Sequence, residues 1–516
     1  MCRTLIFLVA GLPVVAAAAS GQAIAPTSRP GIVAGSPATA PSAPRLQDLP
    51  SQRLGEPFVS RAAGITFKPP AGGVQTRRMG YGEEIVQYSN TDEKWSLKVS
   101  RVSFDRAALL VKTDPKPSDV EPGILDQSAH QLLLQNVNTE ILRKDVINVG
   151  AMDAGLLCSR FTQGGSFWLR QQAFLRANDQ LFYIFDFITP SNRTISDKPD
   201  YEDPAERMAI DIFRAMLDSI ELLNQRDLLK DNQERLYRTR QLQVDLADRL
   251  RQAIVPDQYF RVMREGKDVG WIYVAEEMGE YQGKSGLIVA TVRSGRPDEK
   301  TLVNVSAEAF WMPDGNRQGD EAWMTITRVA RQDASSTVTE LGQSGRRSRR
   351  VRDKTAGEDK LDPRQPAVRV IERYEMTVTQ SGGQSPRTIE RELPPYYLPN
   401  AASSLILRVL PTREAKGYLF AAWVGAEGEV IYRYLDVQPQ QEALFNGQMI
   451  QAVVIKDRIG LEGDPTFHYL NPEGKYLGST CPATGVVIVA TDMQTITRLF
   501  PDAKVVRPHL LEGRTR

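Results

Sequence analysis

The most strand-like stretch of the chain reads Leu181-Phe182-Tyr183-Ile184-Phe185-Asp186-Phe187-Ile188. β-Branched and aromatic residues are enriched in strands, and this density of them is typical of a strand in the middle of a sheet. Three further strands are expected before it, at residues 140–149, 155–162 and 167–177. The connections between these strands are short, which favours antiparallel pairing. The sequence therefore predicts an antiparallel sheet in the first half of the chain.

Two amphipathic helices are expected to pack on this sheet. The first covers residues 122–137, with Pro122 near its first position and leucines along one face. The second follows Asp203, which we expect to cap the helix N-terminus. Its apolar residues recur every 3.6 residues as far as Ile220, so this stripe must face the sheet. An antiparallel sheet with two packed helices predicts an α+β domain over residues 58–224.

Three short segments of this domain match a known family at the level of pattern. They are Gly64-Ile65-Thr66-Phe67-Lys68-Pro69-Pro70, Leu169-Arg170-Gln171-Gln172-Ala173-Phe174 and Phe213-Arg214-Ala215-Met216-Leu217-Asp218-Ser219-Ile220. On the basis of these segments, residues 64–223 resemble the PsbP-type fold family, which comprises the extrinsic photosystem proteins and their bacterial relatives. The resemblance implies a binding or assembly factor, since the family consists mostly of such proteins and not of enzymes. No motif carries over a metal site or a photosystem contact.

The second half of the chain predicts a larger, mostly-β domain. Residues 225–256 are polar and charge-rich, which favours a partly helical connector. About a dozen antiparallel strands and a helix at 400–410 are expected within 257–507. A chain of hairpins this long predicts a curved antiparallel meander, a half-barrel with one or two helices, whose concave face must be filled. The polar, aperiodic stretch 333–366 predicts a disordered insertion, and residues 508–516 a tail.

Turns at the two ends of this domain suggest a second resemblance. An opening hairpin is expected around Gly266-Lys267-Asp268-Val269-Gly270, and Asn446-Gly447 predicts a tight two-residue hairpin turn. The closing segment reads Tyr469-Leu470-Asn471-Pro472-Glu473-Gly474-Lys475-Tyr476-Leu477-Gly478. In the order of its strands and turns, the domain resembles the half-barrel domains of bacterial envelope proteins, including lipoprotein-carrier-like folds.

The N-terminus has the pattern of an export signal. Arg3 precedes an uncharged apolar run that ends in the alanines 16–19, so a signal peptide is expected over residues 1–19. The run is about 15 residues long, whereas a spanning helix needs about 20; the alternative is an uncleaved membrane anchor. Residues 20–57 are rich in Pro and Ala and predict a flexible tether. We therefore expect a periplasmic or secreted protein, with no transmembrane segment in the mature chain.

Charge and cysteine content restrict the function further. The formal net charge of the 516 residues is +1, so no global field attracts nucleic acid, which is not expected as a partner. After cleavage, Cys158 and Cys481 remain far apart in sequence. Two cysteines do not make a disulfide framework, and we expect two buried, unpaired thiols, with oxidation as the alternative.

No reactive constellation is visible in the sequence. The three histidines, His130, His468 and His509, are far apart and follow no hydrolase or metal-site spacing. Carboxylates cluster at Glu276-Glu277, where the expected role is that of solvated surface charge. The sequence therefore predicts no catalytic residue, no metal site and no cofactor.

Two sets of residues are candidates for binding. Aromatic side chains lie on neighbouring elements of the second domain, and some of them are expected in its core. Those that line the concave face would hold an apolar or sugar-like ligand by stacking and burial. The candidates are Trp271, Tyr273, Trp323, Tyr396, Tyr397, Trp423 and Tyr432. A run of arginines within the predicted insertion is a candidate for docking to an anionic polymer or lipid headgroups. The run consists of Arg346, Arg347, Arg349, Arg350 and Arg352.

The functional hypothesis is an exported, non-enzymatic binding or assembly protein of the cell envelope. It would hold an apolar ligand or a partner segment on a concave β surface, with a lipid, a glycan or an envelope protein as its partner. One alternative is a carboxylate-based hydrolase that acts on an envelope polymer. The other is a purely structural subunit of an envelope complex.

Overall fold

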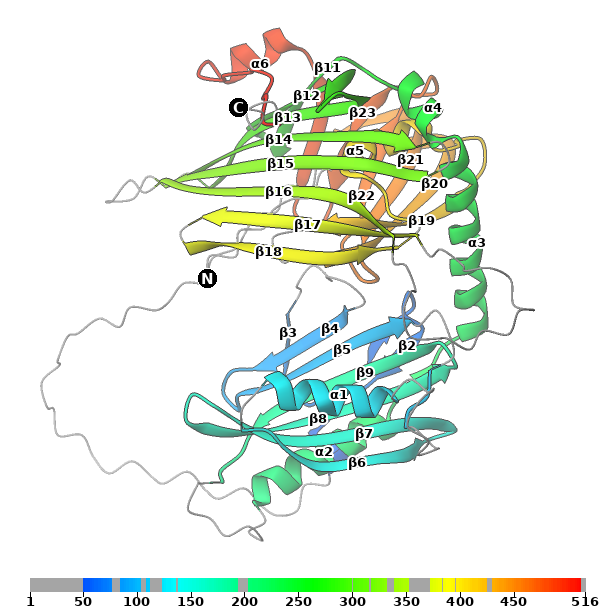
Figure 1. Cartoon of the computed structure of the whole chain (residues 1–516), viewed down its shortest axis with the longest axis vertical. Helices are drawn as coiled ribbons and strands as arrows, with labels where there is room; N and C mark the ends of the chain where they lie inside the picture. The colour runs from blue at the N-terminus through cyan, green and yellow to red at the C-terminus, as the bar shows by residue number, and fades with distance from the viewer. Residues whose placement is uncertain are drawn as a thin grey trace, which may run out of the picture. The chain divides into compact units, whose positions relative to one another are not determined.

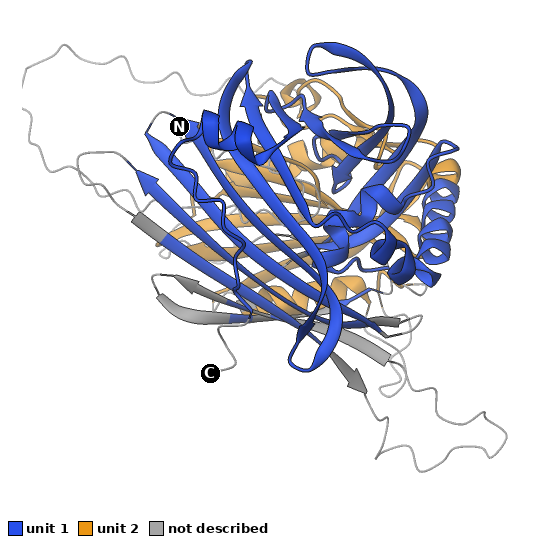
Figure 2. Cartoon of the chain, turned by 90° about the horizontal axis from the view of Figure 1, so that it is seen from above, with its two compact units in different colours: residues 1–17, 79–83, 229–516 blue, residues 18–78, 84–228 orange. Residues whose placement is uncertain are grey.

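A computed structural model describes residues 50–76, 84–103, 108–111, 123–135, 138–193, 203–298, 300–314, 317–331, 338–351, 372–382, 384–394, 396–424 and 429–511. The chain divides into two compact units, shown in two colours in Figure 2. Unit 2 comprises residues 18–78 and 84–228, and unit 1 comprises residues 1–17, 79–83 and 229–516. The predicted signal peptide and the tether as far as residue 49 lie outside the described residues.

Unit 2 is built on an antiparallel seven-stranded sheet with the order β3-β4-β5-β9-β8-β7-β6. β9 contains the aromatic stretch and pairs with β5 and β8, so its prediction as a central strand is confirmed. A smaller sheet has the order β1-β2-β10. The elements are η1 (Pro50–Arg53), β1 (Phe58–Ser60), β2 (Ile65–Phe67), β3 (Val74–Thr76), β4 (Glu84–Asn90), β5 (Trp95–Ser103), α1 (Ile124–Gln135), β6 (Glu140–Val149), β7 (Met152–Gln163), β8 (Ser166–Asn178), β9 (Leu181–Pro190), α2 (Pro204–Asp218) and β10 (Glu221–Leu222).

The two helices of unit 2 cover opposite faces of the large sheet. Leu125 of α1 packs in one cluster with Phe182 of β9, and Figure 1 shows α1 on the near face. Phe213 of α2 stacks on Phe187, with ring centroids 5.9 Å apart. Residues 182 and 187 point to opposite sides because side chains alternate along a strand. Asp203 caps α2 as expected, since its side chain accepts a hydrogen bond from the Ala205 N–H.

The ordered part of unit 2 begins earlier than predicted. Residues 50–57 were expected to belong to the tether, but η1 lies there and packs against α2. The Gly55 N–H donates to the Pro69 carbonyl over 2.7 Å, and the Ala71 N–H donates to the Arg53 carbonyl over 2.8 Å. These backbone bonds fix a stretch whose composition alone favours disorder, so the tether prediction is wrong for residues 50–57.

Gly64 occupies a position that only glycine fits. Its φ is +72°, and a Cβ there would lie 2.2 Å from Leu228 Cδ1 and 2.6 Å from Gln225 Nε2. We expect Gly64→Ala to destabilise unit 2 by about 2–3 kcal/mol, because steric overlap adds to the left-handed backbone strain of about 1–2 kcal/mol. The matched control is Gly164→Ala, where φ is +61° but a Cβ meets open space. Hydrogen exchange of β2 and β9 peptides measures the difference; equal effects would contradict the steric argument.

Unit 1 is built on one antiparallel sheet of fourteen strands. Its order is β18-β17-β16-β15-β14-β13-β12-β11-β24-β23-β22-β21-β20-β19, so the sheet is open and ends at β18 and β19. Its elements are α3 (Gln225–Val244, whose first four residues belong to unit 2), α4 (Leu246–Gln252), β11 (Asp257–Arg264), β12 (Lys267–Tyr281), β13 (Lys284–Asp298), β14 (Thr301–Asp314), β15 (Arg317–Arg331), β16 (Val338–Val351), β17 (Glu372–Gly382), β18 (Gln384–Leu393), α5 (Asn400–Val409), β19 (Lys416–Val424), β20 (Glu429–Phe445), β21 (Gln448–Ile459), β22 (Thr466–Leu470), β23 (Tyr476–Cys481), β24 (Val486–Thr491) and α6 (Met493–Leu499).

Helix α5 packs on one face of this sheet. It contacts β13 and β14 and also β19, although β19 is well separated from them in the strand order. The sheet must therefore curve around the helix. Eight residues of α5 are buried, and its Leu405 and Ile406 belong to the largest core cluster. Leu242, Leu246 and Leu250 of α3 and α4 join the same cluster, so these two helices add to the core of unit 1.

The prediction of a disordered insertion over residues 333–366 is wrong for Val338–Val351. This segment forms β16, which pairs with β15 on one side and β17 on the other. Its polar sequence gives no strand periodicity, but backbone pairing on both edges stabilises the extended conformation. Residues 332–337 and 352–371 lie outside the described residues.

The segment after α6 continues over the opposite face of the sheet. Ile496 of α6 packs with Trp271 and Tyr273, and Leu511 packs with Phe310. The backbone N–H groups of residues 510 and 511 donate to Glu308 Oε2 over 2.6 and 2.8 Å. The predicted tail is therefore ordered as far as Leu511. No helix in the described ranges is long and apolar enough to cross a membrane.

Candidate functional site

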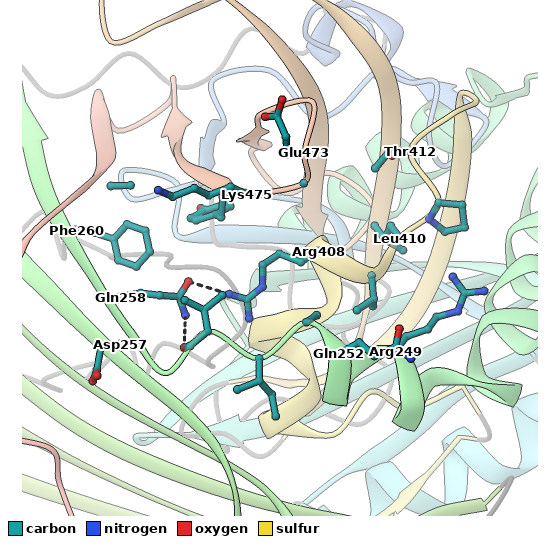
Figure 3. A pocket seen from close by; sticks show the side chains of 18 of the residues that line it. Arg249, Gln252, Asp257, Gln258, Phe260, Arg408, Leu410, Thr412, Glu473 and Lys475 are labelled. Atoms are coloured by element: carbon teal, nitrogen blue, oxygen red, sulfur yellow. Dashed lines mark hydrogen bonds between the residues drawn. The ribbon is translucent and has the colours of Figure 1, made fainter.

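A pocket of about 1190 Å³ lies beside the C-terminal end of α5. It is bordered by the end of α4, the start of β11, the segment 410–416, the β22–β23 turn and the end of β24. All of these elements belong to unit 1. Figure 3 shows the side chain of Arg408 crossing the pocket toward Gln258, with Phe260 on one side and Leu410 on the other.

A buried ion pair with Glu276 holds Arg408 at the floor of this pocket. Arg408 Nη2 donates to Glu276 Oε1 and Oε2 over 2.7 and 2.6 Å, and Nη1 donates to Gln258 Oε1 over 2.8 Å. Gln258 Nε2 and the Val255 N–H also donate to the Glu276 carboxylate, each over 2.9 Å. The exposed fractions of the Arg408 and Glu276 side chains are 8% and 2%. Gln258 of β11 and Glu276 of β12 together hold the guanidinium of Arg408 in one orientation.

One hydrogen-bond donor of this network has no acceptor within the described residues. Arg408 Nε is buried and has no hydrogen-bond partner among the described residues. A buried donor without a partner costs about 1–3 kcal/mol, so such groups call for an explanation. Arg408 lines the pocket, so this unpartnered donor lies beside the space that a bound molecule would occupy.

The rim of the pocket carries two cations that are not engaged elsewhere. Lys475 lies on the β22–β23 turn and Arg413 follows α5; both are exposed and neither forms an ion pair in the part of the chain that the structure describes. Two rim carboxylates are engaged. Asp492 accepts a hydrogen bond from the Thr495 N–H over 2.7 Å, and Asp257 accepts one from the Tyr273 hydroxyl over 2.6 Å.

A second buried network lies behind the wall of the pocket. Tyr476 lines the pocket, and its hydroxyl is 2.9 Å from His468 Nδ1. His468 Nε2 is 3.3 Å from Asp457 Oδ2, which also pairs with Arg433 Nη2 over 2.7 Å. Burial by itself would raise the pKa of Asp457, but Arg433 and His468 outweigh it and lower this pKa to about 2. Burial raises the pKa of the Tyr476 hydroxyl.

This network is closed toward solvent. His468 is 1% exposed, and both of its ring nitrogens are engaged. Arg433 also donates to the Ser403 carbonyl and hydroxyl, over 3.2 and 2.7 Å, and so ties α5 to β20 and β21. The geometry is that of an anchor for the helix, since no reactive atom of His468 or Asp457 reaches the pocket.

The aromatic candidates from the sequence fall into three groups, all outside the pocket. Trp323, Tyr397 and Trp423 are buried around α5, with the two indole centroids 6.4 Å apart. Trp271 and Tyr273 share a face of β12, as expected, but this face lies under α6 and the C-terminal segment.

Tyr396 and Tyr432 form the third group. Their rings stack at 5.9 Å, and their hydroxyl oxygens are 3.1 Å apart. Both side chains are half-buried. The structure therefore does not bring the seven predicted ligand residues to one surface, and α5 occupies the face where Trp323 and Trp423 lie.

The arginine run is only partly a surface feature. Arg346 is exposed, whereas Arg347 is 2% exposed and its guanidinium lies 5.5 Å from the centre of the Tyr397 ring. Arg347 is thus not placed to dock an anionic surface. Arg349 and Arg350 belong to β16, but their side chains are outside the described residues, and Arg352 is outside them altogether.

Glu321 lies beside Arg347, at the start of α5. Glu321 Oε1 accepts a hydrogen bond from the Asn400 N–H over 2.7 Å and one from the Tyr397 hydroxyl over 3.4 Å. Burial raises the pKa of Glu321 to about 7, although Arg347 opposes this shift. The helix dipole favours a charged carboxylate at the N-terminus of α5. Burial of Glu321 favours the neutral carboxyl group, so the two effects on its charge oppose each other.

The remaining reactive side chains are dispersed. Cys158 is buried and free, with its pKa raised to about 11 by burial, and Cys481 is free and half-buried. His130 is exposed on α1, and His509 lies in the C-terminal segment. Within the described ranges, no group of three or more His, Cys, Asp or Glu side chains is arranged to hold a metal ion.

Sequence reasoning missed both the pocket and the buried ion pair that holds Arg408 there. Glu276 was expected to be a solvated surface charge, which is wrong because Arg408, 132 residues away, neutralises it in the interior. One signal was present: Glu276 stands among the apolar residues 271–275 of a strand, where a carboxylate is costly unless it is paired. No signal identified Arg408 as its partner.

No protein-family model matches the chain, and no curated protein matches it. Among solved structures, the cyanobacterial PsbP protein CyanoP from Synechocystis sp. PCC 6803 is 13% identical, with 32% of this chain and 91% of that chain covered and a TM-score of 0.23. A protein from Bacteroides thetaiotaomicron VPI-5482 is 10% identical, with 38% and 61% covered and a TM-score of 0.22. The first is of the type that residues 64–223 resemble, but at these TM-scores neither similarity supports a conclusion about fold or function.

Proposed function

We propose that this protein is an exported, non-enzymatic binding or assembly protein of the cell envelope, and that its ligand occupies the pocket beside α5. In this proposal unit 2 has a PsbP-type fold, and unit 1 is a half-barrel whose concave face is filled by α5. The ligand site is thus at the end of the helix and not on the concave face. One observation carries the proposal: the buried, pre-oriented Arg408 on the pocket floor with its unpartnered Nε.

The arrangement of charges favours binding over hydrolysis. Glu276 is fully engaged by Arg408, Gln258 and the Val255 N–H, so it is not placed as a free general base. His468 is enclosed in the core behind Tyr476. A ligand in the pocket would therefore meet a donor and apolar walls but none of these bases. The structural-subunit alternative is supported by α5, which packs against the curved face of the sheet.

Filling the pocket tests the proposal. Thr412 lines the pocket on the segment after α5 and is not part of the core, so Thr412→Trp is expected to occupy the space without unfolding the protein. We expect a small molecule to co-purify with the native protein and to be reduced at least about tenfold in this variant, as judged by mass spectrometry after native extraction. Thr497→Trp, on the exposed face of α6, is the control and should retain it.

Two results would refute the pocket as the ligand site. One is a wild-type protein that carries no small molecule above the level found in an unrelated purified protein. The other is the same amount of the molecule in the Thr412→Trp and Thr497→Trp proteins. Hydrogen exchange of α5 peptides in both variants checks that the fold is intact.

A further inference from the structure

Within the described residues, the pocket combines apolar walls with two unpaired cations and one buried donor that has no acceptor. Ile254, Phe260 and Leu410 contribute apolar surface. Arg408 Nε on the floor is a charged donor with no partner in the described residues. The cations Arg413 and Lys475 lie on the rim, as described above. An apolar cavity with a few convergent charged donors is typical of a site that orients one polar end of a ligand.

Most of the charged groups near the pocket are engaged by other groups of the protein. Asp257 and Asp492 hold the Tyr273 hydroxyl and the α6 N-terminus, respectively. Lys416 is paired with Glu414, with its Nζ 2.9 Å from the carboxylate oxygen. Glu473 is exposed on the same turn as Lys475. Among the described residues that line the pocket, the charged side chains with no ion pair or hydrogen bond are therefore two cations, Arg413 and Lys475, and one anion, Glu473, which leaves an excess of one positive charge for an anionic ligand.

We propose that the pocket binds an amphipathic anion, a molecule with an apolar body and a carboxylate or phosphate ester group. The body lies against Phe260, Leu410 and Ile254. The anionic group accepts hydrogen bonds from Arg408 Nε and from Lys475 and Arg413 at the rim. This inference rests on the proposed function, because it names the class of ligand that the same pocket holds.

The floor network explains why an arginine can serve here. Glu276 and Gln258 occupy both Nη atoms, which fixes the guanidinium plane and leaves Nε as the free donor. Since Glu276 already neutralises Arg408, the net attraction for an anion comes from the rim cations. Arg408 then adds a directed, charge-assisted hydrogen bond.

Calorimetric titration of the full chain with four single-chain probes tests this inference. The probes are dodecanoate, dodecyl phosphate, dodecanol and dodecyltrimethylammonium, each below its micelle concentration. We expect dodecanoate, dodecyl phosphate or both to bind at least about tenfold more tightly than the cationic probe, the range expected for one charge-assisted hydrogen bond. Which anion binds more tightly distinguishes a carboxylate ligand from a phosphate ester.

Variants at the rim test whether Lys475 and Arg413 contribute to the binding of the anion. Lys475→Gln combined with Arg413→Gln is expected to weaken binding of the tighter anion about tenfold and to leave dodecanol binding unchanged. Both side chains are exposed, so the double variant should fold. Lys300→Gln, exposed on the β13–β14 turn and outside the pocket, is the matched control and should change neither.

Three outcomes overturn the inference: equal affinity for all probes, no binding of any probe, or an anion affinity that the double variant leaves unchanged. None of them refutes the proposed function. A neutral molecule that co-purifies with the native protein and is lost in Thr412→Trp would support the pocket as a ligand site and exclude the anion. Failure of the co-purification test would instead refute the site itself.

Discussion

Arg433→Met is expected to destabilise unit 1 by about 3–5 kcal/mol, because it leaves the buried carboxylate of Asp457 without its main partner. Arg433 Nε lies 3.1 Å from both carboxylate oxygens, and Nη2 lies 2.7 Å from Oδ2. The exposed fractions of the two side chains are 4% and 2%. The substitution also removes the two hydrogen bonds to Ser403 that hold α5.

Arg328→Met is the matched control for this prediction. Arg328 pairs with Glu340 at 2.6 Å, but their side chains are 60% and 54% exposed. Exposed ion pairs contribute about 0–1 kcal/mol, so the control should stay within that range. Adding Asp457→Asn to Arg433→Met removes both charges, and it is expected to recover part of the lost stability.

Hydrogen exchange in a denaturant series is the suitable measurement, since a chain with two units need not unfold in one step. Peptides from α5, β20 and β21 report the stability of the anchored region. Equal losses of stability in Arg433→Met and Arg328→Met would show that burial does not determine how much these ion pairs contribute.

The stability of unit 1 is expected to fall as pH rises from about 4.5 to 7, with Glu321 as the cause. Its pKa in the folded protein is raised from 4.5 to about 7. A group whose folded pKa is raised contributes stability that is fully present below the unfolded pKa and is lost as pH rises through the folded one. A shift of this size corresponds to roughly 3 kcal/mol as an upper limit.

Glu321→Gln is expected to remove this dependence. A glutamine keeps an acceptor oxygen for the Asn400 N–H but carries no charge at any pH. The variant should therefore gain stability relative to the wild-type protein as pH rises from 5 to 8, by up to roughly 3 kcal/mol.

Hydrogen exchange of α5 peptides at each pH, corrected for the intrinsic exchange rate, measures this dependence. Glu442→Gln, at an exposed position of β20, is the control and should follow the wild-type protein. If the difference in stability between the wild-type protein and Glu321→Gln stayed constant from pH 5 to 8, the prediction would be contradicted.

Much of the local structure was predictable from the sequence. The apolar period of α2, the Asp203 cap and the strand Leu181–Pro190 are all found as expected. Asn446-Gly447 forms the turn between β20 and β21, with φ values of 49° and 77°. These features depend on residues within a few positions of one another, so propensity and periodicity suffice to predict them.

The candidate site was not predictable in the same way. The sequence identified aromatic residues of unit 1 as notable, and Trp323 and Trp423 do meet, but in the core around α5. Trp271 was a candidate for the concave face and lies on the other one. Alternation along a strand predicts that two residues share a face, but it does not say which face is covered by a helix.

By itself, the sequence determined the antiparallel, mainly-β character of the chain and the positions of α1, α2, α5 and several turns. Only the tertiary structure decided that α5 packs inside the curved sheet, that Arg408 neutralises Glu276 and that Arg433 neutralises Asp457. The physical reason is the distance along the chain over which each of these effects acts. Backbone propensity and capping act between neighbours, whereas a buried charge is stabilised by whichever opposite charge the fold brings within about 3 Å, at any distance along the chain.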